Sequence, residues 1–152
     1  MSKFYMLVGL PASGKSTIAV NLFNSNINSR LRSSDGLRSE LLNDINDMSR
    51  NGEIFDLLHS IIKADLYFER DTIYDATNLN ADRRKEFLKS LSLLKCEKIC
   101  IFVNTPYDIC IERNLKRERV VPISVMEKMK DNLQKPDMSE GWNEIKEVTY
   151  DT

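Results

Sequence analysis

The sequence has 152 residues, of which 41% are apolar and 30% are charged, enough for one domain to bury a core without disulfides or a structural metal. Its net charge of -1 excludes a strongly basic nucleic-acid-binding protein, so any polyanion contact must come from a local basic patch. The three cysteines lack Cys-x-x-Cys spacing, and no signal segment or long apolar stretch is present. We therefore expect a single cytoplasmic domain over residues 1–152, with reduced thiols and no membrane contact.

The first predicted elements enclose a glycine-rich loop. Residues 4–8 form a short apolar run typical of a strand, and residues 17–23 have helical spacing. Residues 9–17 between them have the spacing Gly-x-x-x-x-Gly-Lys-Ser of a P-loop, also called Walker A. This context of strand, loop and helix predicts a phosphate-binding site.

Each residue type in the loop has a physical role in binding ATP. Glycines allow backbone N–H groups to turn toward phosphates, and the helix N-terminus adds partial positive charge. Lys15 reaches the outer phosphates, and Ser16 helps to hold Mg²⁺. The residues expected to bind ATP are Gly9, Pro11, Ala12, Ser13, Gly14, Lys15, Ser16 and Thr17.

Asp35 follows the second predicted strand. The pattern predicts a strand over residues 30–34, a short helix over 36–43, a loop to residue 51 and a long amphipathic helix over 52–70. From local sequence alone, Asp35 is favoured as the N-cap of the short helix. His59 lies on the long helix without clustered ligand partners, so we expect it to pack or to be exposed rather than to bind a metal.

The second half of the chain continues the alternation of strands and helices. Strands are predicted over residues 71–75, 96–103 and 145–150, and helices over 81–91, 106–117 and 122–134. Asn80 could cap the helix that follows it, and Trp142 is expected to pack against the body of the domain. The pattern predicts an α/β fold with a parallel sheet of about five strands and helices on both faces.

In such a sheet, ligands bind outside the carboxyl ends of the strands, so the P-loop, Asp35 and residues 75–80 should meet in one cleft. There Asp35 could accept the proton of an acceptor hydroxyl, as a kinase requires. Arg38 suits an acceptor that carries negative charge, although a local salt bridge with Asp35 would explain it equally well.

Asp75 ends an apolar strand, where a carboxylate could hold Mg²⁺ directly or through water. Ala76 follows it in place of the second acid that a hydrolytic motor usually needs. Thr77 and Asn78 could hydrogen-bond to substrate or could only form a capped turn.

A basic cluster comprises Arg113, Lys116, Arg117 and Arg119. It is either a solvated helix end or a lid that closes over the phosphates and stabilises charge during transfer.

Four blocks of the sequence resemble the 5′-hydroxyl polynucleotide kinases, which act in the repair of nucleic-acid ends. Their order and approximate spacing agree from residue 4 to about residue 130. The blocks are residues 9–17, residues 34–38, Thr77-Asn78-Leu79-Asn80 followed by Arg83-Arg84, and residues 113–117 leading to 121–123. The resemblance implies the kinase type of P-loop NTPase fold, with an Arg-rich lid at about residues 113–122.

The resemblance also implies a phosphotransferase that moves the γ-phosphoryl group of ATP to the 5′-hydroxyl of DNA or RNA. In it, Asp35 would be the general base and Arg38 would bind the acceptor's neighbouring phosphate. Arg117 would reach the ATP phosphates with support from Arg113, and Asn78 would belong to the active-site network.

In the resembled enzymes an aspartate directly precedes the Thr-Asn-Leu-Asn block, whereas here Asp75 lies one place earlier. Two alternatives stay open from the residues alone: a kinase of a small-molecule hydroxyl, such as a nucleoside, sugar or antibiotic, and a non-catalytic ATP-binding switch.

Overall fold

The computed structural model describes residues 1–149, which form a five-stranded sheet of order β2-β3-β1-β4-β5. Every neighbouring pair of strands is parallel, as the sequence predicts. The strands are β1 (Ser2–Val8), β2 (Arg30–Ser33), β3 (Thr72–Asp75), β4 (Cys96–Val103) and β5 (Glu144–Val148).

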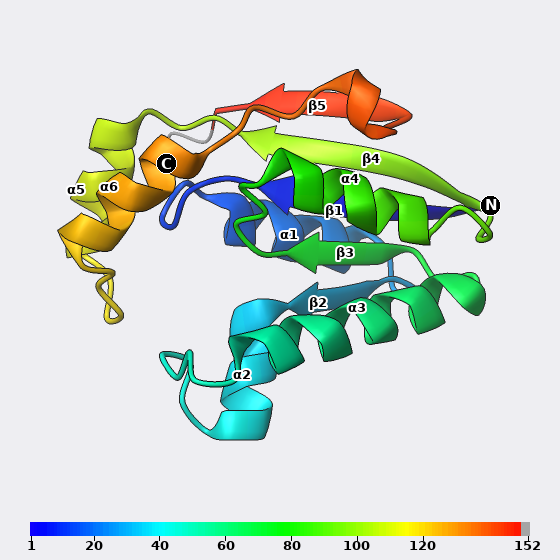
Figure 1. Ribbon diagram of the computed structural model, residues 1–152, viewed down its shortest axis with the longest axis horizontal. Helices are drawn as coiled ribbons and strands as arrows, with labels where there is room; N and C mark the ends of the chain where they lie inside the picture. Colours follow the sequence, from blue (N-terminus) through cyan, green and yellow to red (C-terminus); the bar gives the residue numbers. More distant parts are fainter. Residues whose placement is uncertain (150–152) are drawn as a thin grey trace.

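Helices cover both faces of the sheet, which confirms the predicted layers. They are α1 (Lys15–Ser25), α2 (Ser34–Leu42), α3 (Asn51–Tyr67), α4 (Ala81–Ser90), α5 (Tyr107–Leu115) and α6 (Ile123–Asn132). Figure 1 shows α1 behind the sheet and α3 and α4 in front of it, with α5 and α6 beside the ends to which the strand arrows point. Those carboxyl ends are where an α/β sheet binds its ligands.

The central strand β1 is buried on both faces because side chains alternate along a strand. Phe4, Met6 and Val8 pack in one cluster with residues of α3 and α4, whereas Leu7 packs with Ala19 of α1 on the other face. Each large side chain buried in this way contributes roughly 1.5–3 kcal/mol. This double burial accounts for the continuous apolar run in the sequence.

The N-cap of α2 differs from the local expectation. Ser33, in extended conformation, accepts a hydrogen bond of 2.9 Å from the Gly36 N–H, and the helix begins at Ser34. The interpretation of Asp35 as the N-cap is therefore wrong, because Asp35 lies in the first helical turn. The cap of α4 is predicted correctly, since Asn80 accepts a hydrogen bond of 2.9 Å from the Arg83 N–H.

The C-terminal segment packs against the body of the domain. Trp142 is 4% exposed, as expected, and is preceded by a short 3-10 helix, η1 (Met138–Glu140), that the sequence pattern does not predict. The predicted last strand is confirmed as β5, and Tyr150, its predicted end, lies outside the described residues. Among residues 1–149, no helix is both long and apolar enough to cross a membrane.

Candidate active site

The P-loop connects β1 to α1 through residues 9–14 in a backbone path that favours glycine. A Cβ on Gly9 would lie 2.9 Å from Ser13 Oγ and 3.1 Å from the Val103 carbonyl oxygen, so a side chain there would clash. Gly14 has a φ of 100°, in the left-handed region, and directly precedes α1. The first N–H groups of α1 have no intrahelical acceptors, so this turn can bind phosphate oxygens.

The loop after β3 holds the P-loop in place. The Gly9 N–H donates to the Thr77 carbonyl oxygen at 3.1 Å, and Asn78 Nδ2 donates to the Leu7 carbonyl oxygen at 2.9 Å. These two residues, expected to contact substrate, therefore connect the third strand to the phosphate-binding loop.

Two residues after β4 contact the other side of the P-loop. Thr105 Oγ1 donates to the Ser13 carbonyl oxygen at 2.7 Å, and Arg113 Nη1 approaches the same oxygen at 3.3 Å. Arg113, expected to support nucleotide binding, thus lies directly against the loop. The sequence contains no local signal for Thr105, because its contact spans 92 residues.

The Lys15 ammonium lies among charges from three other segments. Burial lowers the pKa of Lys15, the carboxylates of Asp75 and Asp35 oppose that effect, and the charge of Arg117 lowers the pKa further. The structure therefore brings together the ends of β1, β2 and β3 and the segment after α5.

Ser16 and Asp75 form the part of the site that could hold a cation. Ser16 Oγ donates a hydrogen bond of 2.9 Å to Asp75 Oδ2, so both present oxygen atoms at one place. Residues 1–149 contain no group of three or more His, Cys, Asp or Glu side chains that could hold a metal unaided. Mg²⁺ is usually held by one or two protein oxygens together with waters and substrate phosphates, so the pair fits this ion.

The Asp35 carboxylate is held by two guanidinium groups. Arg38 Nη1 donates to Oδ1 at 3.0 Å, and Arg119 Nη1 donates to Oδ2 at 2.9 Å. The Arg38 side chain is 5% exposed, whereas the Asp35 side chain is 45% exposed. Arg38 also donates from Nε to Asn51 Oδ1 at 3.2 Å, which fixes the guanidinium behind the carboxylate.

Arg119 is the functional candidate that sequence reasoning missed. It belongs to the predicted basic cluster, but its pairing with Asp35 spans 84 residues, so no local pattern distinguishes it from its neighbours. Arg119 Nε also donates to Asn46 Oδ1 at 2.6 Å, in the segment between α2 and α3. The connection between α5 and α6, residues 116–122, therefore reaches across to Asp35.

Residues 4–136 match the protein family described as an AAA domain. The chain belongs to this family. Its fold is that of the P-loop kinases, with the parallel sheet, the flanking helices and the phosphate-binding loop in the expected order.

Similar proteins include several kinases. An L-seryl-tRNA(Sec) kinase of Methanococcus maripaludis is 24% identical over 151 residues, which are 97% of this chain and 58% of that protein. The AAA domain thus spans little more than half the length of this curated relative.

Two solved structures share the fold of this AAA domain. Kti12 of Chaetomium thermophilum, in complex with ADP-AlF3, is 17% identical with a TM-score of 0.79, covering 97% of this chain and 89% of that chain. A chain of the Pnkp1/Rnl/Hen1 RNA repair complex is 22% identical with a TM-score of 0.76, covering 88% of this chain and 44% of that chain.

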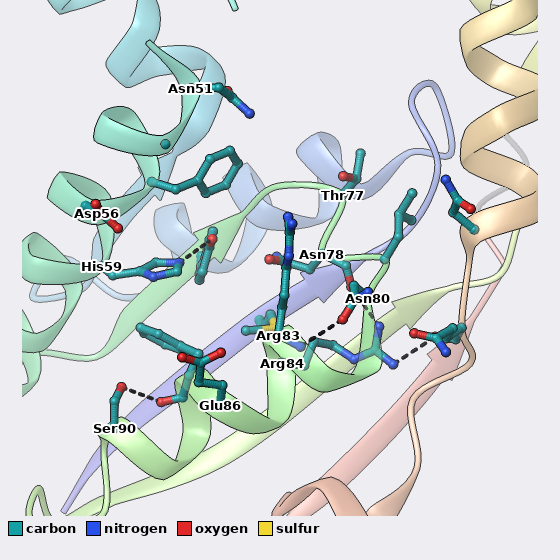
Figure 2. A pocket seen from close by; sticks show the side chains of 18 of the residues that line it. Asn51, Asp56, His59, Thr77, Asn78, Asn80, Arg83, Arg84, Glu86 and Ser90 are labelled. Carbon is teal, nitrogen blue, oxygen red and sulfur yellow. Dashed lines mark hydrogen bonds between the residues drawn. The ribbon is translucent and has the colours of Figure 1, made fainter.

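Beside the P-loop, the AAA domain has a groove of about 1070 Å³ between α3 and α4 (Figure 2). Thr77 and Asn78 lie on its wall, together with His59. His59 Nε2 and the Tyr74 hydroxyl share a hydrogen bond of 2.9 Å, which agrees with the expected packing role. The groove itself was not predicted, because it forms only where two helices meet over the sheet.

Proposed function

We propose that this AAA domain is an ATP-dependent, Mg²⁺-requiring kinase that phosphorylates the 5′-hydroxyl of a polynucleotide. The observation that carries the proposal is the Asp35 carboxylate, which acts on the pKa of the P-loop Lys15 while Arg38 holds it in place. An ATP phosphate bound at Lys15 would therefore have a carboxylate nearby that could act as a base toward the acceptor hydroxyl. The acceptor class is supported by the four sequence blocks and by relatives named for RNA substrates or RNA repair.

In the proposed reaction, Asp35 accepts the proton of the acceptor 5′-hydroxyl as that oxygen bonds to the γ-phosphorus. The bond between the γ-phosphorus and the bridging oxygen breaks, and ADP leaves with its electron pair. Lys15 and the N–H groups of the P-loop bind the phosphates. Ser16 and Asp75 would hold Mg²⁺, which would neutralise phosphate charge when bound.

We also propose that residues 113–122 act as a lid of this single domain. Arg113 lies against the P-loop, and Arg117 is near enough to Lys15 to lower its pKa. Both could approach the ATP phosphates when the lid closes. Arg119 must release Asp35 Oδ2 before an acceptor hydroxyl can use that oxygen.

A transfer assay with terminally labelled ATP tests the acceptor class. The panel contains 5′-hydroxyl DNA and RNA oligonucleotides, nucleosides, sugars and a seryl-tRNA. Labelling of the oligonucleotides, with an acceptor affinity that falls steeply as salt rises, is the expected result. Labelling of only a nucleoside, sugar or aminoacyl group would replace the polynucleotide with that acceptor, and no labelling would favour an ATP-binding switch.

Asp35→Asn tests the general base. The variant keeps the shape of the side chain and removes its basicity, so we expect ATP binding to persist and kcat to fall by about 10²–10⁴-fold. ATP binding is measured by calorimetry, and transfer with the best acceptor of the panel. An unchanged kcat would remove Asp35 from its proposed role.

A further inference from the structure

The groove between α3 and α4 has an aromatic wall. The half-buried rings of Phe55 and His59 line the groove, and their centroids lie 6.2 Å apart. The ring centroid of His59 lies 4.4 Å from that of Phe87 and 5.5 Å from that of Tyr74, so His59 packs against two further rings. Aromatic surfaces of this kind stack nucleobases with little dependence on sequence.

The opposite side of the groove carries the exposed guanidinium of Arg83. Figure 2 shows Arg83 extending from α4 toward the space between α3 and residues 76–80. Among residues 1–149, the Arg83 guanidinium has no hydrogen-bond or ion-pair partner, unlike Arg84 beside it, which is bound to Glu140. An exposed guanidinium is suited to a two-pronged contact with a phosphate.

The remaining charges of the groove limit the size of the ligand. Lys63 also lines the groove and, among residues 1–149, has no ion-pair partner, but Asp56, Glu86 and Asp131 line the groove as well. Three carboxylates would repel a long run of phosphates, whereas one phosphate at Arg83 can be accommodated. The charges therefore fit a single nucleotide rather than a polymer lying along the groove.

The groove is continuous with the proposed reaction centre through Arg38. This side chain donates to Asp35 on one side and to Asn51 on the other, and its guanidinium carbon lies 5.7 Å from the centroid of the Phe55 ring. Asn51 and Phe55 both line the groove. The groove wall and the proposed general base thus contact the same arginine, so the groove lies next to the reaction centre.

We infer that this groove is the subsite for the terminal nucleotide of the acceptor, with its base against Phe55 and His59 and its 3′-phosphate at Arg83. The inference rests on the proposed function and specifies which part of the acceptor is recognised. It assigns the acceptor phosphate an exposed arginine in addition to Arg38, which is 4% exposed. It also predicts that a 5′ end must be unpaired to enter.

The only histidine of the sequence makes a direct test possible. The His59 ring signals are followed by NMR, with the P-loop filled by a non-hydrolysable ATP analogue and Mg²⁺. Adenosine 3′-monophosphate, which has a free 5′-hydroxyl, should shift them saturably through the ring current of its base. Adenosine should give the same shift with about tenfold weaker affinity, and an abasic deoxyribose 3-phosphate should give no ring-current shift.

Arg83→Ala should weaken adenosine 3′-monophosphate binding about tenfold, to the level of adenosine, and leave adenosine binding unchanged. Lys85→Ala is the matched control, because Lys85 is exposed on the same helix and does not line the groove. Absence of a His59 shift, or equal nucleotide affinity in Arg83→Ala and wild type, would overturn the subsite.

The transfer assay separates this failure from failure of the proposed function. If oligonucleotides are phosphorylated but His59 does not respond, the kinase stands and the subsite falls. If His59 responds with the expected Arg83 dependence but no oligonucleotide is phosphorylated, the groove binds a nucleotide and the proposed reaction falls.

Discussion

His59 shows how its surroundings change the chemistry of one residue. The imidazole is half-buried on α3, and its centroid lies 4.4 Å from the centroid of the Phe87 ring. Burial lowers the pKa of His59, and the charge of Lys63 lowers it further, against the opposing charges of Asp56 and Glu86. The folded protein therefore keeps the ring neutral at a pH at which the unfolded chain binds a proton.

The lowered pKa predicts the pH dependence of stability. Above the unfolded pKa of about 6.5 the imidazole is neutral in both the folded and the unfolded protein, so it does not affect the free energy of unfolding. As pH falls from there toward the folded pKa, the unfolded chain binds a proton that the folded protein does not, and the fold loses stability. We expect the thermal unfolding midpoint to fall on acidification from about pH 6.5 to 5, and His59→Gln to reduce that slope. Carboxylates with a lowered pKa, such as Glu140, change the free energy of unfolding only below about pH 4.5, so they do not affect its pH dependence between about pH 6.5 and 5. An unchanged slope in His59→Gln would show that other groups cause the effect.

The connection after α5 joins two parts of the proposed site. Arg113 in the last turn of α5 contacts the P-loop, and Arg119, in the following connection, contacts Asp35. The Arg119 and Asp35 side chains are 22% and 45% exposed. Because solvent screens exposed ion pairs, this contact contributes at most about 1 kcal/mol, so it can open readily.

Arg119→Ala should therefore have a small effect. We expect the KM for the acceptor to change by no more than about fivefold, which corresponds to about 1 kcal/mol, with kcat nearly unchanged. Steady-state kinetics at fixed ionic strength would measure this, with the exposed neighbour Glu118→Ala as the control. A fall in kcat of more than about 100-fold would instead place Arg119 on the transferring phosphate.

Across the whole molecule, one buried ion pair connects the groove to the C-terminal segment. Arg84 donates to Glu140 from Nε and from Nη2, each at 2.9 Å, and also to the carbonyl oxygens of Asn78 and Gln134. Glu140 further accepts a hydrogen bond of 3.1 Å from Trp142 Nε1. Residues 76–80, α4, the segment before η1 and η1 itself therefore share one polar network.

Removing one partner of this pair should destabilise the fold strongly. Glu140→Gln preserves the side-chain shape but leaves the Arg84 charge buried without a counter-charge, at a cost of about 3–5 kcal/mol. Urea denaturation would measure the free energy of unfolding. Glu144→Gln, at an exposed position of β5, should cost less than about 0.5 kcal/mol. Equal stability of the two variants would mean that Arg84 finds another partner or water.

Local sequence was a good guide to the elements of the fold. Apolar runs and helical spacing predicted every strand and α-helix of the described chain within a few residues, because both faces of the sheet are buried and each helix has one apolar side. The cap of α2 was misassigned because Ser33, Ser34 and Asp35 are all suitable caps. The choice follows from the sheet, in which Ser33 pairs with Asp75 as the last residue of β2.

Local sequence likewise predicts one part of the candidate site, and the tertiary structure decides the other. The P-loop was recognisable from the sequence because its phosphate-binding geometry depends on nine neighbouring residues, whose spacing sets the backbone path. The contact of Arg119 with Asp35 and the aromatic groove depend on residues far apart along the chain, and many arginines or aromatic rings could have formed them. Such contacts form only when the helices pack on the sheet, because interactions between neighbouring residues do not distinguish one arginine or aromatic ring from another.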